Sequence, residues 1–110
     1  MMTRPLVELA KTIRSKNAGV DQITFDVIFP DRESYELVKR SGALTAETVL
    51  RLYGIPRERL TAFVEFEPAL AIKFTIRRER PSGSPGERDV FGAQQYAPLF
   101  DLPIPLDPPP

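Results

Sequence analysis

The sequence predicts one α+β domain in which a mainly antiparallel sheet of about four strands packs one face against two short helices. The chain has 110 residues, which is the size of a single domain. Apolar residues make up 42% of it, which favours a folded core over disorder. Three segments alternate apolar and polar residues, and two helical segments follow the first of them. We expect residues 1–106 to form this domain and residues 107–110 to form a proline-rich tail.

The N-terminal segment is short and apolar. Pro5 suits the first turn of a helix, and Leu6, Leu9, Ala10 and Ile13 would then share one helical face. The same residues fit a short strand that ends at Ala10. The sequence leaves both possibilities open.

The clearest strand is residues 22–29 (QITFDVIF), in which alternate residues are apolar as period two requires. The residues expected on its buried face are Ile23, Phe25, Val27 and Phe29. Thr24, Asp26 and Ile28 take the other face, and Pro30 ends the strand. Two short helices are predicted between residues 31 and 54.

Capping residues mark the ends of these two helices. Asp31 and Thr45 suit the N termini because their side-chain oxygens accept hydrogen bonds from the free backbone N–H groups. Gly42 and Gly54 stand where a left-handed residue ends a helix. Only a few residues separate the helices, so they should form a compact pair.

Residues 60–67 (LTAFVEFE) and 71–78 (AIKFTIRR) alternate as two further strands, separated by Pro68 and close enough to pair as a hairpin. In such a hairpin Glu65 or Glu67 would face Lys73 or Arg77, as an exposed ion pair of little energetic weight. Residues 98–104 suit an edge strand, where proline is tolerated. The expected core residues are Ile23, Phe25, Val27, Tyr35, Val38, Val49, Leu52, Val64, Phe66, Ile72, Phe74 and Ile76.

Charge and hydropathy limit the classes of partner that the chain could bind. Fifteen basic residues balance fifteen acidic ones, so the formal net charge is zero. A neutral chain without a basic cluster argues against nucleic acid and against an anionic membrane surface, and favours self-association or docking to a partner. No segment has the ~20 apolar residues of a membrane span, and the N terminus lacks the apolar centre of a signal peptide. We therefore expect a cytoplasmic protein.

The chain contains neither cysteine nor histidine. This composition excludes disulfides, thiolate catalysis, cysteine-based zinc sites and a Ser-His-Asp arrangement. Any reaction would have to use carboxylates, lysine, tyrosine or hydroxyls. The chain also lacks the glycine-rich fingerprints of nucleotide-binding loops. We expect no cofactor and no metal.

The densest polar chemistry lies in residues 14–19 (RSKNAG), which we expect to form a loop. Its cations, hydroxyl, amide and glycine are the groups that bind a phosphate or carboxylate. A plain solvated turn has the same composition, and residue chemistry alone favours that interpretation. The candidate anion-binding residues are Arg14, Ser15, Lys16, Asn17 and Gly19.

Other candidate features also have plain structural alternatives. Asp26, in an apolar strand, is a possible base, or else a carboxylate on the solvent face or paired to an arginine. Glu65 and Glu67 form a conceivable magnesium pair, although a solvated strand face explains them better. We expect residues 79–89 to form a long Pro- and Gly-rich loop, which could be a lid or a second anion-binding nest, although a flexible connection explains it better. The candidates for loop closure or partner contact are Ser82, Gly83, Ser84, Gly86, Gln94 and Gln95.

Several stretches in combination resemble a known family. They are LVELAKTIRSKNAG, TFDVIFPDRESYELVKRSGALTAETVLRLYG, FEPALAIKFTI and PSGSPGERDVFGAQQYAPL. They resemble small bacterial and fungal proteins of unknown function that accompany, or are fused to, homologues of the acyclic terpene utilisation protein AtuA. The resemblance runs from about Leu6 to Leu106, and none of its motifs is an established catalytic signature.

The order of features also resembles the C-terminal domain of AtuA-like proteins, which is classed as ferredoxin-like. The resemblance therefore implies a ferredoxin-like fold. That domain opens with RSGDKG where this chain has RSKNAG. The acidic residue is missing and Asn17 stands near its place, so a metal or proton role tied to that acid does not carry over.

The resemblance implies an accessory subunit that binds an AtuA-like large protein and completes its site in the catabolism of terpenoid-type carboxylic acids or acyl-CoA compounds. Arg14, Lys16 and Asn17 would hold an anionic group, and residues 82–86 would close over it or meet the partner. One alternative is an autonomous lyase or isomerase with Asp26 or a glutamate as base and Lys16 or Arg14 as electrophile. Another is a structural module whose sheet edge pairs with a second copy in a homo-oligomer.

Overall fold

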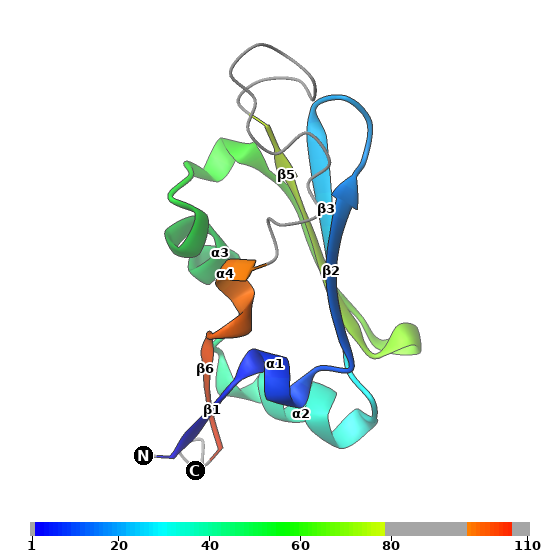
Figure 1. The fold of residues 1–110 in the computed structure, drawn as a ribbon, viewed down its shortest axis with the longest axis vertical. Coiled ribbons are helices and arrows are strands. Elements are labelled where there is room, and N and C mark those ends of the chain that lie inside the picture. The colour runs from blue at the N-terminus through cyan, green and yellow to red at the C-terminus, as the bar shows by residue number, and fades with distance from the viewer. Residues whose placement is uncertain (1, 79–96, 107–110) are drawn as a thin grey trace.

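The centre of the fold is a four-stranded antiparallel sheet in the order β2-β3-β5-β4 (Figure 1). The computed structural model describes residues 2–78 and 97–106. The sheet strands are β2 (Thr12–Asn17), β3 (Gln22–Ile28), β4 (Leu60–Phe66) and β5 (Ala71–Arg77). They form two hairpins, β2-β3 and β4-β5, which join through the pairing of β3 with β5.

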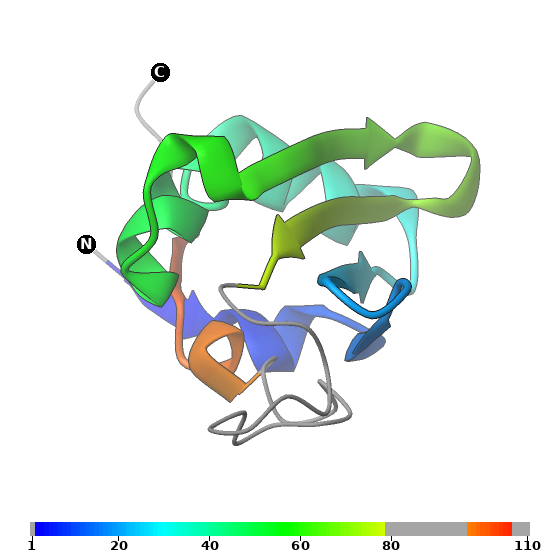
Figure 2. The same ribbon diagram turned by 90° about the horizontal axis from the view of Figure 1, so that it is seen from above.

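Helices lie on one side of this sheet, as the view from above shows (Figure 2). The two main helices are α2 (Arg32–Ser41) and α3 (Ala46–Tyr53). The prediction of an α+β domain with an antiparallel sheet and two short helices is confirmed, and these layers are consistent with a ferredoxin-like arrangement. The smaller elements are β1 (Thr3–Pro5), α1 (Leu6–Leu9), the 3-10 turns η1 (Arg57–Arg59) and η2 (Glu67–Ala69), α4 (Ala97–Phe100) and β6 (Pro103–Pro105).

The two chain ends meet in a second, two-stranded sheet. Arg4 of β1 is paired with Ile104 of β6, and Leu6 donates a backbone hydrogen bond to Leu102. The N-terminal segment therefore contains both elements that its sequence left open, a strand and then a single helical turn. Of the edge strand expected at residues 98–104, only the end is present, as β6, because the range begins in the helical turn α4. The predicted tail, residues 107–110, lies outside the described residues.

The predicted helix caps are present. The Asp31 carboxylate accepts a hydrogen bond from the Ser34 backbone N–H at 2.8 Å. The Thr45 hydroxyl accepts one from the Thr48 backbone N–H at 3.2 Å. Gly42 follows α2 in a left-handed conformation with φ 70°, which a residue with a Cβ adopts only at a cost.

An aromatic cluster ties the sheet to the helices. The Phe25 ring of β3 stacks on Phe74 of β5 with centroids 4.6 Å apart, and Tyr53 of α3 tilts against Phe25 at 5.3 Å. Most of the predicted core is buried, but Leu52 is only partly buried, and Val64 and Phe66 are exposed. The terminal segments and helix connections supply core residues that we did not predict, namely Leu6, Leu9, Leu44, Leu99, Leu102 and Ile104.

The prediction of a loop at residues 14–19 is wrong for its first four residues. They belong to β2, which pairs with β3 from Thr12 opposite Ile28 to Asn17 opposite Ile23. Only the turn between the two strands is a loop, and Gly19 has φ 97° within it. An edge strand gains its stability from backbone pairing with β3, so it forms without an apolar alternation of its own.

The predicted faces of the strand at residues 60–67 are correct for Leu60, which packs against the core, but wrong after it. The register shifts between Leu60, which lies opposite Ile76, and Ala62, which lies opposite Thr75. One extra residue at this bulge turns every later side chain to the other face. As a result Phe63 stacks on the core residue Phe74 at 6.2 Å, and Val64 and Phe66 face away from the helices.

We predict that Asp31→Ala lowers the free energy of unfolding by about 1 kcal/mol, because the substitution removes the N-cap acceptor of α2. Urea denaturation at pH 7 measures the change. Asp31→Asn is the matched control, since it keeps a capping oxygen and should lose much less. Equal losses in the two variants would contradict the cap assignment.

Candidate functional site

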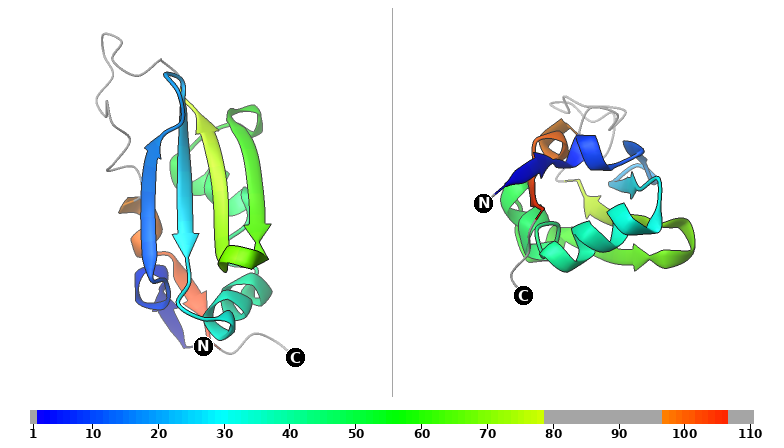
Figure 3. Two further views of the ribbon diagram at one scale, coloured as in Figure 1. Left: turned by 90° about the vertical axis from the view of Figure 1, so that its right-hand side faces the viewer. Right: turned by 90° about the horizontal axis from the view of Figure 1, so that it is seen from below.

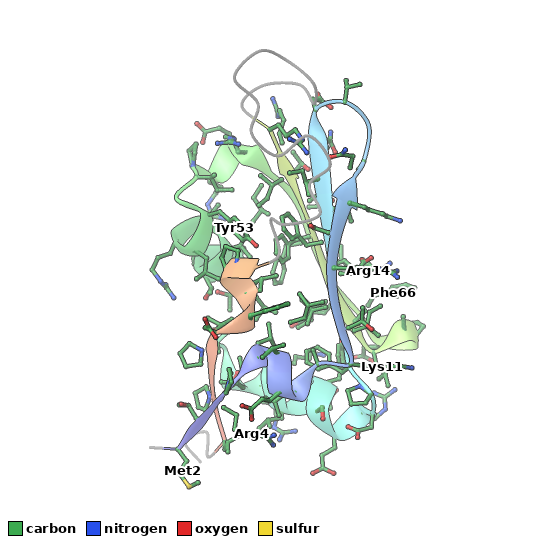
Figure 4. The ribbon with its side chains drawn as sticks, viewed as in Figure 1. Met2, Arg4, Lys11, Arg14, Tyr53 and Phe66 are labelled. Carbon is green, nitrogen blue, oxygen red and sulfur yellow. The ribbon has the colours of Figure 1, made fainter. Side chains whose placement is uncertain are left out.

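The polar segment of β2 divides between the two faces of the sheet. Side chains alternate along a strand, so Arg14 and Lys16 point away from the helices while Ser15 and Asn17 point toward them. Figure 4 shows Arg14 on the far side of the sheet from Tyr53. The five predicted anion-binding residues therefore do not converge on one point, and Gly19 serves the turn.

The helix-covered face carries a polar cluster that joins both hairpins. Asn17 Oδ1 accepts a hydrogen bond from Nη2 of Arg78, the residue that follows β5, and both side chains are at least partly buried. Ser15 is 9% exposed and lies opposite Phe25 in the register. Tyr53 packs on Phe25, and burial raises the pKa of its phenol above the ordinary value of 10.0.

Sequence reasoning did not single out Arg78. It lies 61 residues from Asn17 in the chain, and only the pairing of β2, β3 and β5 brings the two together. The Arg78 backbone N–H donates to Asp21 O at 2.7 Å, which fixes the end of β5 beside the turn between β2 and β3. No spacing in the sequence indicates this arrangement.

The opposite face of the sheet, which we call the open face, carries side chains that alternate away from the helices. Figure 3 (left) shows all four strands of this face with no described helix in front of them. Its residues are Thr12, Arg14 and Lys16 of β2, Gln22, Thr24, Asp26 and Ile28 of β3, Ala71, Lys73, Thr75 and Arg77 of β5, and Ala62, Val64 and Phe66 of β4.

A row of four side chains crosses the centre of the open face, one from each strand: Arg14, Asp26, Lys73 and Val64. Asp26 Oδ2 accepts a hydrogen bond from Arg14 Nε at 3.0 Å, and Lys73 Nζ lies 3.8 Å from Asp26 Oδ1. Asp26 is only 3% exposed. The carboxylate is thus held between two cations, which agrees with the plainer interpretation of Asp26 as an arginine-paired residue.

The open face is basic although the chain is neutral. Its strands contribute four cations, Arg14, Lys16, Lys73 and Arg77, and one carboxylate, Asp26, which gives this face a net charge of +3. Lys16 lies opposite Thr24 and makes no ion pair with any residue in the described parts of the chain. Sequence reasoning found no basic cluster because these cations come from two strands, β2 and β5, that lie far apart in the sequence.

A groove of about 320 Å³ lies on the open face over β4 and β5. Its lining combines the apolar side chains of Ala62, Val64 and Phe66 with residues Thr24, Lys73, Phe74 and Thr75. The Lys73 ammonium lies 5.6 Å from the centroid of the Phe66 ring. The Thr24 and Thr75 hydroxyls are hydrogen-bonded across the strands at 3.2 Å. Charged and apolar groups therefore adjoin on one surface.

The two glutamates of the conceivable magnesium pair lie elsewhere. Glu65 faces Ile72 in the register, and Lys73 faces Val64, so the predicted cross-strand pairing with Lys73 is wrong. Glu67 instead accepts a hydrogen bond from Lys39 of α2 at 3.0 Å. Within residues 2–78 and 97–106 no three acidic side chains gather in a metal-binding group. Nor does any helix of the described chain have the length and apolar character to cross a membrane.

The remaining candidates fall outside the described residues: Ser82, Gly83, Ser84, Gly86, Gln94 and Gln95. The molecule is thus defined by an α+β domain with a helix-covered face and a basic, partly apolar open face. Residues 6–103 match the family model described as a domain of unknown function, DUF4387, and the chain belongs to this family. No functionally curated protein and no solved structure matches the chain.

We predict that Arg14→Ala lowers the free energy of unfolding by about 1 kcal/mol, more than Lys73→Ala does. The substitution removes the only hydrogen bond that the buried Asp26 carboxylate accepts within the described chain, and the partial exposure of Arg14 limits the loss. Lys16→Ala, on the same strand and face, is the control and should change stability little. Chemical denaturation of the three variants decides the order, and equal losses from Arg14→Ala and Lys16→Ala would contradict it.

The Lys39–Glu67 pair predicts a pH dependence. The hydrogen bond from Lys39 and its charge lower the pKa of Glu67 below the ordinary 4.5. The pair therefore stabilises the fold above pH 4.5, and this contribution disappears as the pH falls through the lowered pKa. The difference in free energy of unfolding between the wild type and Glu67→Gln should be constant from pH 7 to 5 and become smaller in more acid solution.

Thermal or urea unfolding across this pH range measures the difference in free energy of unfolding. The difference between the wild type and Lys39→Met should decrease over the same pH range. If the difference in free energy of unfolding stays constant down to pH 3, the Lys39–Glu67 pair is not its cause.

Proposed function

We propose that the chain is an accessory subunit that binds an AtuA-like large protein and completes its site in the catabolism of terpenoid-type carboxylic acids or acyl-CoA compounds. The resemblance of the chain to AtuA-associated proteins motivates the choice of partner. The basic open face is the single observation that carries the proposal. A sheet face of this size with no described covering suits docking, and its cations suit an anionic group.

Lys16 and Arg14 are the residues that would meet the anionic group. They lie two positions apart on edge strand β2, and both side chains project from the open face. Arg14 Nε is held by Asp26, so its position on the face is fixed. Ser15 and Asn17 would support the strand from the covered side rather than touch the anion. Residues 82–86 keep their proposed part in closing the site or meeting the partner.

An autonomous lyase or isomerase draws less support from the geometry. A general base has to reach the proton that it abstracts. Both oxygens of Asp26 are instead occupied by, or adjacent to, cations of the neighbouring strands, and its side chain is almost fully buried. The same arrangement gives Asp26 a clear role in organising the open face.

The proposal predicts a stable complex when the chain is co-expressed with an AtuA-like protein from the same genome. Affinity capture through a tag on the larger protein should retain the small chain, and turnover of branched acyl-CoA substrates should require both. If the proteins do not associate and turnover is the same with the larger one alone, the proposal fails.

A second prediction concerns the anionic group. Lys16→Ala should raise KM for the acyl-CoA substrate about tenfold, because one charge-assisted contact is lost, and should leave the complex intact. Arg51→Ala is the matched control, since Arg51 is an exposed cation of α3 on the helical side of the sheet. Equal KM values for the two variants would show that Lys16 does not contact the anionic group of the substrate.

A further inference from the structure

The groove on the open face has the anatomy of a docking site. Val64 and Phe66 are 47% and 43% exposed, and with Ala62 they form an apolar row along β4. A cation borders this row, because Lys73 lies beside Val64, and Arg14 lies three strands from Val64 in the same cross-strand row. An apolar centre bordered by charges is the usual composition of a protein interface.

The charge of the open face indicates what occupies it. A second copy docked face to face would bring two surfaces of net charge +3 together, and like charges across an interface oppose association. A surface rich in carboxylates would instead be attracted by all four cations. The apolar row in turn requires an apolar side chain, because otherwise the contact would leave Val64 and Phe66 in water.

We propose that the groove over β4 and β5 seats an apolar side chain of a different protein, whose neighbouring carboxylate pairs with Lys73. The inference rests on the proposed function for the existence of the larger partner, and adds the surface and the chemistry of the contact. Lys73 links the two parts of the site, since its ammonium lies near both Phe66 and Asp26. A partner carboxylate would share that ammonium with Asp26.

The test compares the affinities of matched variants for the AtuA-like protein. Surface plasmon resonance with the larger protein immobilised measures the dissociation constant and the association rate at two salt concentrations. Val64→Lys and Lys73→Glu should each weaken the complex at least tenfold, and raising the salt should slow association. Val7→Lys is the control for Val64→Lys, because Val7 of α1 is similarly exposed at 41%. Arg51→Glu is the control for charge reversal, and both controls should bind like the wild type.

The outcomes separate the two proposals. A complex that forms but is unaffected by both open-face variants overturns the groove and leaves the accessory-subunit function standing. Sedimentation of the chain alone provides a second test of the groove. If the wild type is a dimer and Val64→Lys is a monomer, the occupant of the groove is a second copy and the groove proposal is overturned.

If the wild type binds no AtuA-like protein, the proposed function fails and the groove is judged with a chemical probe, the apolar anion anilinonaphthalene sulfonate. NMR perturbations by this dye confined to Val64, Phe66 and Lys73 support the groove, and perturbations elsewhere or none overturn it.

Discussion

The pairing of β3 with strands on both sides is the constraint on which the rest of the structure depends. β3 joins the two hairpins, because β2 and β5 are its neighbours in the sheet. Phe25, at its centre, stacks on Phe74 and packs against Tyr53 of α3. One residue further along, Asp26 projects to the open face and holds Arg14 and Lys73. The same strand therefore builds the core on one face and organises the charges on the other.

A single inserted residue decides the character of the open face. Without the bulge between Leu60 and Ala62, the regular alternation would direct Val64 and Phe66 to the core and Phe63 to solvent. With it, Phe63 completes the aromatic cluster and an apolar row lies beside Lys73. Exposed apolar side chains have an energetic cost in an isolated domain. Their presence next to a basic patch is understandable if another protein covers them.

The two sides of β2 give the RSKNAG segment two separate tasks. Ser15 and Asn17 belong to the covered face, where Asn17 accepts a hydrogen bond from Arg78 and links β2 to the end of β5. Arg14 and Lys16 belong to the open face and its net charge of +3. The polar residues on the covered side of β2 thus provide a hydrogen-bond partner for Arg78, and the cations on the other side remain exposed to a partner protein. Exposed cations also discourage unwanted pairing at a sheet edge.

The sequence by itself determined the elements whose signals are local. Alternation fixed β3 and β5, and Asp31, Gly42, Thr45 and Gly54 fixed the ends of α2 and α3 through contacts a few residues apart. The plainer interpretation of Asp26 also followed from its place in a strand. Only the tertiary structure decided that residues 12–17 form a strand, because the stability of β2 comes from β3 rather than from its own side chains. Likewise, only the pairing of the strands shows the β4 bulge, gathers cations from β2 and β5 onto one face and brings Arg78 to Asn17.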